Sequence, residues 1–255
     1  MKRFITNRYT IFALGTIFVF LVWFVVSLII DKNGSIFPSP VLTFARLGEL
    51  LQETNTYRCL LFTMLRMLAG FGLSFLLALV LGAFAGNSTW LYEFLKPLMV
   101  TIKSIPTVAL VFVFIVIVAP RDAPIFVVML ICFPILYEGV VGGIKNVEKD
   151  LVDASKVDGA NSFKSLLFVK VPLAIPYIIV AMASSFALSF KIEIMAEVLT
   201  GYTRNGLGSV IRAAQAADPN DMTTIFAYAL LAVLIMLLVT LIEQVIKQAF
   251  KKNKD

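Results

Sequence analysis

Six ionisable residues lie inside or beside long apolar stretches of this 255-residue chain, where a charge is costly and therefore marks a candidate functional position. Glu193 and Glu197 are four residues apart, so a helix would place both on one face. Two adjacent carboxylates need a cation or a shared proton. This pair could line a water-filled path, or could help to position Lys191 or Arg204 for a solute.

The remaining charges of this kind are Arg66, Lys103 and Glu138, and each also has a structural interpretation. Arg66 is near the outer end of its apolar stretch, from which a long side chain reaches the headgroups. Lys103 could reach the cytoplasmic headgroups, or Glu138 could pair with it. Pro106 predicts a kink at residues 104–106, next to Lys103. Our candidates for lining a translocation path are Lys103, Pro106, Glu138, Lys191, Glu193 and Glu197.

The sequence offers almost nothing for catalysis or metal binding. It contains no His, the commonest metal ligand and general base, and Cys59 and Cys132 have no metal-binding spacing. No Gly-rich loop ends in Gly-Lys-Ser or Gly-Lys-Thr, so the usual ATP-binding loop is missing. An intramembrane enzyme would need a Ser-Lys or a paired-carboxylate site, and Glu193/Glu197 is the only candidate pair of carboxylates. We therefore predict no catalytic residue, no metal site and no directly bound cofactor.

The composition is that of a membrane protein. Hydrophobic residues make up 60% of the chain and charged residues only 15%, whereas soluble domains are far less apolar. The net charge of +6 does not indicate a nucleic-acid partner, because the basic residues lie at the ends of apolar stretches, as membrane topology requires. We expect contact with membrane lipid and none with nucleic acid.

The apolar stretches predict an all-α polytopic membrane protein with about six transmembrane helices. The expected spans are 10–30, 60–85, 97–119, 125–144, 173–190 and 224–246. Between the first two spans, residues 41–52 have the pattern of a short amphipathic helix on the membrane surface. Residues 191–222 read as a long mixed segment. Gly82 and Gly86, four residues apart, predict a close helix contact within the second span.

The distribution of Lys and Arg predicts the orientation. With six spans both termini lie on one side, and thirteen of the 22 basic residues then fall on that side against six on the other. Basic residues are in excess in cytoplasmic segments. We therefore predict cytoplasmic termini and a cytoplasmic location for the loop between the fourth and fifth spans.

That loop, residues 148–172, is the longest polar interruption with helix signals. We expect one helix over 148–157, a turn over 158–161, and a second helix over 162–171 with Ser162 as its N-cap and a break at Pro172. Gly159 would allow a left-handed backbone or a close contact. Small residues, Ala154 and Ala160, and a charged rim suit docking to another protein, although a plain connecting loop has the same pattern. The rim is formed by Asp153, Lys156 and Asp158.

The loop resembles the EAA motif of bacterial ABC importer permeases. That motif has Glu-Ala-Ala, three residues, Gly, nine residues, and then Ile-x-Leu-Pro. Here the corresponding positions are Asp153, Ala154, Ser155, Gly159, Val169, Val171 and Pro172, with every spacing kept. Residues 37–250 are similar to the nitrate/sulfonate/taurine-type branch, in Phe37-Pro38-Ser39-Pro40, Met64-Leu65-Arg66, Ala196-Glu197 and Gly206-Leu207-Gly208 among others. Residues 119–122 depart from that branch, which more often has a Gly-containing turn there.

The resemblance implies a multi-pass protein of the bacterial inner membrane with a type I ABC importer permease core and cytoplasmic coupling helices in the loop. These helices would bind the ATPase subunit through Asp153, Ala154, Ser155, Lys156, Asp158, Gly159, Ala160 and Pro172. The implied partners are a second permease copy in a homodimer, two ABC ATPase subunits that hold the ATP and Mg, and an extracytoplasmic solute-binding protein. We expect three segments: a tail and first span over 1–36, the permease domain over 37–250, and a basic tail over 251–255.

The resulting prediction is a permease subunit of an ATP-driven ABC importer for a small solute, either an anion, a sulfonate-like molecule or a vitamin-precursor-like molecule. The alternative is a stand-alone ion- or proton-coupled carrier or channel that uses Glu138, Glu193 and Glu197. Dependence on an ATPase partner would distinguish the two.

Overall fold

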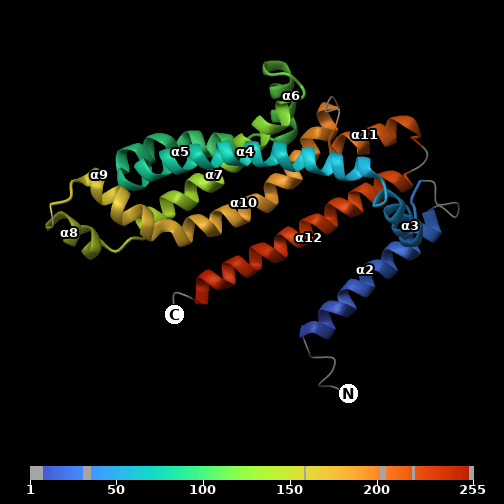
Figure 1. Ribbon diagram of the computed structural model, residues 1–255, viewed down its shortest axis with the longest axis horizontal. Helices are drawn as coiled ribbons and strands as arrows, with labels where there is room; N and C mark the ends of the chain where they lie inside the picture. The colour runs from blue at the N-terminus through green and yellow to red at the C-terminus, as the bar shows by residue number, and fades with distance from the viewer. Residues whose placement is uncertain (1–7, 31–35, 158, 202–204, 220–221, 253–255) are drawn as a thin grey trace. The chain divides into compact units, whose positions relative to one another are not determined.

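The computed structural model describes residues 8–30, 36–157, 159–201, 205–219 and 222–252. Within these ranges all regular structure is helical and no strand occurs (Figure 1). The helices are α2 (Arg8–Ile30), α3 (Pro40–Leu50), α4 (Thr54–Asn87), α5 (Thr89–Ser104), α6 (Thr107–Ile117), α7 (Ala123–Lys145), α8 (Lys149–Val157), α9 (Ser162–Ser165), α10 (Val171–Thr200), α11 (Leu207–Ala217) and α12 (Thr223–Lys252). A π-helical turn, η1 (Leu166–Lys170), joins α9 to α10.

The membrane spans confirm the predicted fold class. Five helices among the described residues are long and apolar enough to cross a bilayer, and α5 with α6 makes a sixth if the pair is one broken span. The kink expected there is a bend of 99°. Its cause is local, because the residue before a proline is biased to extended backbone and Ile105 has φ −73° and ψ 127°.

One predicted boundary is wrong. Residues 191–222 were expected to be a mixed segment, but α10 continues through Lys191, Glu193 and Glu197 and ends at Thr200. Gly201 then terminates the helix with a left-handed φ of 66°. The hydropathy pattern breaks at residue 191 because of these charges, yet the two carboxylates are buried inside the fold rather than in a surface loop.

The chain forms two compact units. The first consists of Met1–Arg58 and Val210–Leu234. In it Trp23 Nε1 donates to the Pro38 carbonyl at 3.1 Å, and the Phe37 ring packs edge-on against Phe226 at 5.4 Å. The predicted short amphipathic helix is confirmed as α3, which Ser39 caps by accepting a hydrogen bond from the Leu42 N–H.

The second unit, Cys59–Ser209 with Ile235–Asp255, contains the predicted path and loop residues that the structure describes. Its core is α7, which packs along α10. Gly139 of α7 lies directly against Ala181 of α10, and Gly70, Gly82 and Gly86 turn one face of α4 toward α7. The close helix contact predicted from Gly82 and Gly86 is therefore confirmed, and it depends on the absence of a Cβ.

We expect Gly86→Ala to destabilise the protein by about 1–3 kcal/mol, the usual cost of overpacking a core. An added Cβ would lie 2.6 Å from the Ile144 Cβ, so one of the two helices must move. Gly72→Ala on the same helix is the control, because a Cβ there meets nothing within 4 Å. Thermal unfolding in detergent measures both, and equal melting temperatures for the two variants would contradict this packing.

Candidate functional site

The loop 148–172 folds as a pair of short helices around Gly159. The first is α8, and Gly159 follows it with φ +85°, while a Cβ on this glycine would meet nothing within 4 Å. Of the two roles considered for Gly159, the left-handed backbone is therefore the one observed. The N-cap of α9 is Asn161, whose side chain accepts from the Lys164 N–H at 2.8 Å, so the prediction of Ser162 as cap is wrong.

The predicted break at Pro172 is also wrong. The chain passes from α9 through the π-helical turn η1 into α10 without interruption, and Pro172 lies in the first turn of α10. A proline cannot donate a helical hydrogen bond and crowds the preceding turn. The wider π-helical geometry immediately before it accommodates both effects. A continuous helical connection therefore links the loop to the span.

Contacts inside the loop hold its two helices together. Ser155 Oγ lies 2.9 Å from Ser165 Oγ, and the Ala160 N–H donates to the Ser155 carbonyl at 3.0 Å. Of the other predicted docking residues, Asp153 and Ala154 are exposed on α8 and Lys156 belongs to the same helix. Asp158 lies outside the described residues. We call α8 the first rod of the loop, and residues 162–170, formed by α9 and η1, the second rod.

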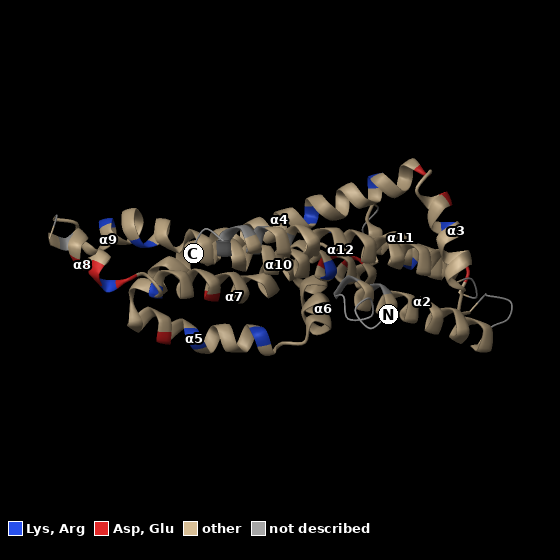
Figure 2. Cartoon of the chain, turned by 90° about the horizontal axis from the view of Figure 1, so that it is seen from below, with Lys and Arg blue, Asp and Glu red and all other residues tan. Residues whose placement is uncertain are grey.

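The loop presents large apolar side chains beside its charges. Val157 is 88% exposed and Phe168 is 74% exposed, and Leu151, Phe163 and Leu167 are also on the surface. Figures 1 and 2 place α8 and α9 together at one end of the α4–α5–α7–α10 helices, where basic and acidic residues gather. Exposed apolar groups rimmed by charge are typical of a protein-binding surface.

Asn87, the last residue of α4, is a candidate that only the structure reveals. Its Nδ2 donates to Ser162 Oγ at 3.2 Å and its Oδ1 accepts from Lys170 Nζ at 2.7 Å. Ser162 and Lys170 are the two ends of the second rod, so α4 is bonded to both. No local pattern marks Asn87, because its partners are 75 and 83 residues away in the chain.

At the other end of the second unit, Glu197 is the centre of a buried polar cluster. Its carboxylate is fully buried and accepts from Arg66 Nη1 at 2.5 Å and from the Gly208 N–H at 2.9 Å. Thr63 Oγ1 lies 2.9 and 3.0 Å from its two oxygens and accepts from the Leu207 N–H at 2.8 Å. The sequence interpretation that Arg66 only reaches the headgroups missed this ion pair.

The cluster joins three segments of the unit. Arg66 also donates to the Asn205 carbonyl at 2.7 Å, so α4, α10 and the turn before α11 meet at one carboxylate. The first N–H groups of α11, which have no partner within the helix, are used here. A Cβ on Gly206 would lie 2.5 Å from Glu197 Oε1, and one on Gly208 would lie 2.5 Å from the Ile194 carbonyl. The two glycines are therefore a steric requirement of the cluster.

Glu193 and Lys191 occupy contrasting positions on α10. Glu193 is fully buried, and within the described part of the chain neither of its oxygens has a hydrogen-bond partner. Lys191 is exposed on the other side of the helix. The structure thus does not bring Lys191 to the carboxylates, and Arg204 lies outside the described residues. That these residues line a path stays a prediction.

Lys103 and Glu138 form the ion pair that the sequence suggested. Lys103 Nζ lies 2.5 Å from Glu138 Oε2, and the two side chains are 41% and 55% exposed. The pair joins the end of α5 to α7, next to the bend at Pro106. A half-exposed ion pair between two spans cannot be covered by hydrocarbon without cost. A polar path or a second protein surface would satisfy it.

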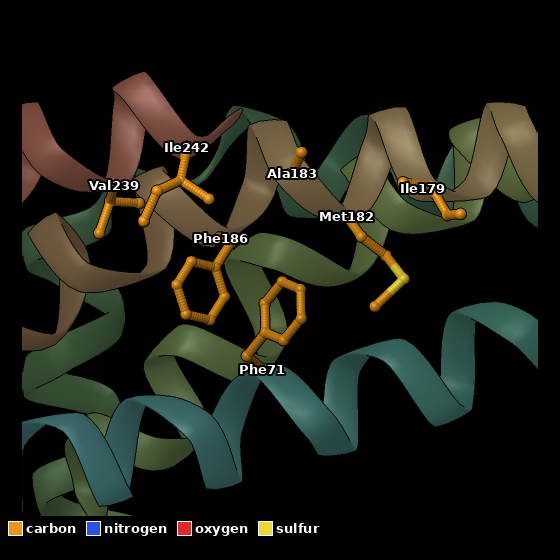
Figure 3. Close-up of a pocket in the computed structure, with 7 residues that line it drawn as sticks. All are labelled: Phe71, Ile179, Met182, Ala183, Phe186, Val239 and Ile242. Atoms are coloured by element: carbon orange, nitrogen blue, oxygen red, sulfur yellow. The ribbon is translucent and has the colours of Figure 1, made fainter. Parts of the chain in front are cut away.

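One cavity of about 300 Å³ opens between α4, α10 and α12, and it differs in character from these polar sites (Figure 3). All seven side chains that line it are apolar. Phe71 and Phe186 form an edge-on pair at 5.4 Å, and Ile242 is 60% exposed. Such a wall offers no hydrogen bond to a polar solute, so the cavity is unsuited to binding one.

Comparisons with known proteins agree with this geometry. The family model described as "Binding-protein-dependent transport system inner membrane component" matches residues 74–252. The riboflavin transport system permease protein RibX of Chloroflexus aurantiacus is 28% identical over 215 residues, which cover 83% of this chain and 79% of that protein. The nitrate import permease protein NrtB of Leptolyngbya laminosa is 27% identical over 140 residues, covering 53% of this chain and 49% of that protein.

The fold is also similar to that of solved ABC transporters. An inward-facing structure of the MetNI methionine ABC transporter has a chain that matches with a TM-score of 0.65 and 18% identity, covering 77% of this chain and 96% of that one. A second match, an amino acid ABC transporter crystallised with histidines, has a TM-score of 0.64 and 14% identity, covering 82% of this chain and 97% of that chain. At these identities the likeness concerns the fold alone.

Proposed function

The chain belongs to the family of binding-protein-dependent transport system inner membrane components, and from this premise we propose that its loop 148–172 receives the ATPase subunit of an ABC importer. The chain is an ABC importer permease subunit and a multi-pass inner-membrane protein. It carries the path, and a partner hydrolyses ATP. The termini lie in the cytoplasm in this proposal, on the side where most Lys and Arg residues fall.

The observation that carries the proposal is the exposed two-helix loop with EAA spacing. Val157 and Phe168 are large apolar groups left on the surface of a polar loop, and the Ser155–Ser165 contact keeps the two rods in register. The unbroken helix from η1 into α10 connects the docking surface directly to a span. Closure of the ATPase pair would act on the spans through contacts that differ between the two states.

The proposed assembly contains two copies of this chain around a shared path, two ATPase subunits and an extracytoplasmic binding protein. The half-exposed Lys103–Glu138 pair supports the second copy, because it provides the polar or protein surface that this pair needs. For the solute we propose a small polar molecule, either anionic, sulfonate-like or vitamin-precursor-like. Two permeases of similar sequence are named for riboflavin and nitrate, and Lys191 adds an exposed cation on α10.

Uptake into proteoliposomes tests the proposal. The tagged chain is reconstituted alone, or with the ATPase that copurifies with it and its binding protein, and uptake of labelled riboflavin, nitrate and an alkanesulfonate is followed. We expect uptake of at least one solute only when ATPase and ATP are both present. Accumulation by the chain alone would contradict the proposal and would favour a stand-alone carrier.

A further inference from the structure

Asn87 lies where the docking loop meets the membrane helices. It is half-buried at the end of α4, and its side-chain amide bonds both ends of the second rod, Ser162 at 3.2 Å and Lys170 at 2.7 Å. An amide provides a donor and an acceptor in one plane, so it can hold a hydroxyl and an ammonium group at the same time. Few other side chains could make both contacts.

The surroundings of Asn87 make this link mechanically stiff. The second rod is bonded to the first through Ser155 and Ser165, so the loop is a connected pair of helices. One residue before Asn87, Gly86 packs against Ile144 near the end of α7, the helix that precedes the loop. The end of α4 is therefore held both to the helix that enters the loop and to the rod that leaves it.

The second rod also contains η1, a helical turn whose length along the helix axis can change. Residues 166–170 are π-helical. Single π-helical turns within α-helices are rare and frequently occur at functional sites. A force on α8 and α9 could be absorbed by tightening this turn instead of moving α10. The bonds from Asn87 span the turn from Ser162 to Lys170, which opposes such a change and directs the displacement to α4.

We propose that Asn87 is a positioning residue that transmits displacement of the docking loop to α4, so that α4 and α10 move together when the ATPase closes. This inference rests on the proposed function, in which the ATPase subunit binds the loop. The loop would then move two helices: α10 through the continuous helix, and α4 through Asn87.

Hydrogen–deuterium exchange on the complex with its copurified ATPase, in lipid nanodiscs, tests the role of Asn87. Exchange is compared without nucleotide and with Mg-ATP plus vanadate. In the wild type we expect nucleotide to change exchange in both the loop and the last two turns of α4. In Asn87→Leu the change in the loop should persist and the change in α4 should fall by about two- to thirtyfold, the range expected for a residue that mediates coupling.

Three further variants distinguish loss of the link between the loop and α4 from a general loss of folded structure. Asn87→Asp keeps acceptors for Lys170 and for the Ser162 hydroxyl, so it should restore most of the α4 response. Ser162→Ala/Lys170→Leu removes the same link from the loop side and should reproduce Asn87→Leu. Asn146→Leu is the matched control, because within the described residues the Asn146 side chain bonds only the Gly142 carbonyl of the helix it follows, α7. It should behave as the wild type.

The outcomes distinguish the inference from the proposed function. If no ATPase copurifies with the wild-type chain, or if nucleotide leaves the loop unchanged, the proposed function is wrong and the inference fails with it. If the wild type responds in the loop and in α4, but Asn87→Leu and the double variant keep the α4 response, only the role of Asn87 is wrong. A loss in Asn146→Leu as large as in Asn87→Leu would also overturn it.

Discussion

Glu197→Ala should destabilise the second unit by about 3–5 kcal/mol, the cost of breaking a buried ion pair from one side. The substitution leaves the Arg66 guanidinium, 13% exposed, without its carboxylate, and it leaves the Gly208 N–H without an acceptor. Thr63 also loses the group to which it donates. Because the cluster joins three segments, the loss should appear as a lower melting temperature and a lower yield of folded protein in detergent.

Glu93→Ala is the control for this prediction. Glu93 pairs with Lys96 at 3.2 Å on the surface of α5, where both side chains are more than half exposed. Exposed pairs of this kind contribute at most about 1 kcal/mol. The prediction fails if Glu197→Ala and Glu93→Ala unfold at the same temperature. Arg66→Lys should be intermediate, because an ammonium keeps the charge but cannot bond Glu197 and Asn205 in the same fork geometry.

Gly159→Val should strongly weaken binding of the ATPase subunit while the membrane helices remain folded. A β-branched residue at φ +85° is strained by about 1–3 kcal/mol, so the turn between the two rods must change. The rods would then no longer present Val157 and Phe168 on one docking surface. A strain of this size corresponds to roughly a five- to hundredfold weaker complex. Copurification of the ATPase with the tagged permease measures the loss.

The control must separate the effect of the changed turn at residue 159 from the effect of adding side-chain atoms near the loop. Gly142→Ala adds a Cβ in open space on α7, a few residues before the loop, in an ordinary helical backbone. We expect it to retain the ATPase and to be slightly more stable, since alanine favours a helix more than glycine does. A Gly159→Val permease that retains its ATPase at wild-type stoichiometry would show that the turn conformation does not matter for docking.

The spans and the loop follow from the sequence because their signals are local. Length and hydropathy decide whether a segment can cross the bilayer, and the turn at Gly159 needs only one residue that tolerates a left-handed backbone. Confirmed features of this kind are the all-helical class, the short helix α3, the Gly82–Gly86 contact and the Lys103–Glu138 pair. The errors at Ser162, Pro172 and residues 191–222 arose where a neighbouring residue or a tertiary contact replaced the local preference.

Tertiary structure alone decided which partners the buried carboxylates have. Arg66 and Glu197 are 131 residues apart, and the sequence presented Glu193 and Glu197 as equivalent carboxylates on one helix face. In the fold the Glu197 carboxylate accepts hydrogen bonds from Arg66, Thr63 and the Gly208 N–H. Within the described chain the Glu193 oxygens have no hydrogen-bond partner. Asn87 acquires its place beside the loop 148–172 in the same way. Apolar periodicity is repeated over many residues and survives one exception, whereas a polar contact depends on two side chains that only the packing of distant helices brings within 3 Å.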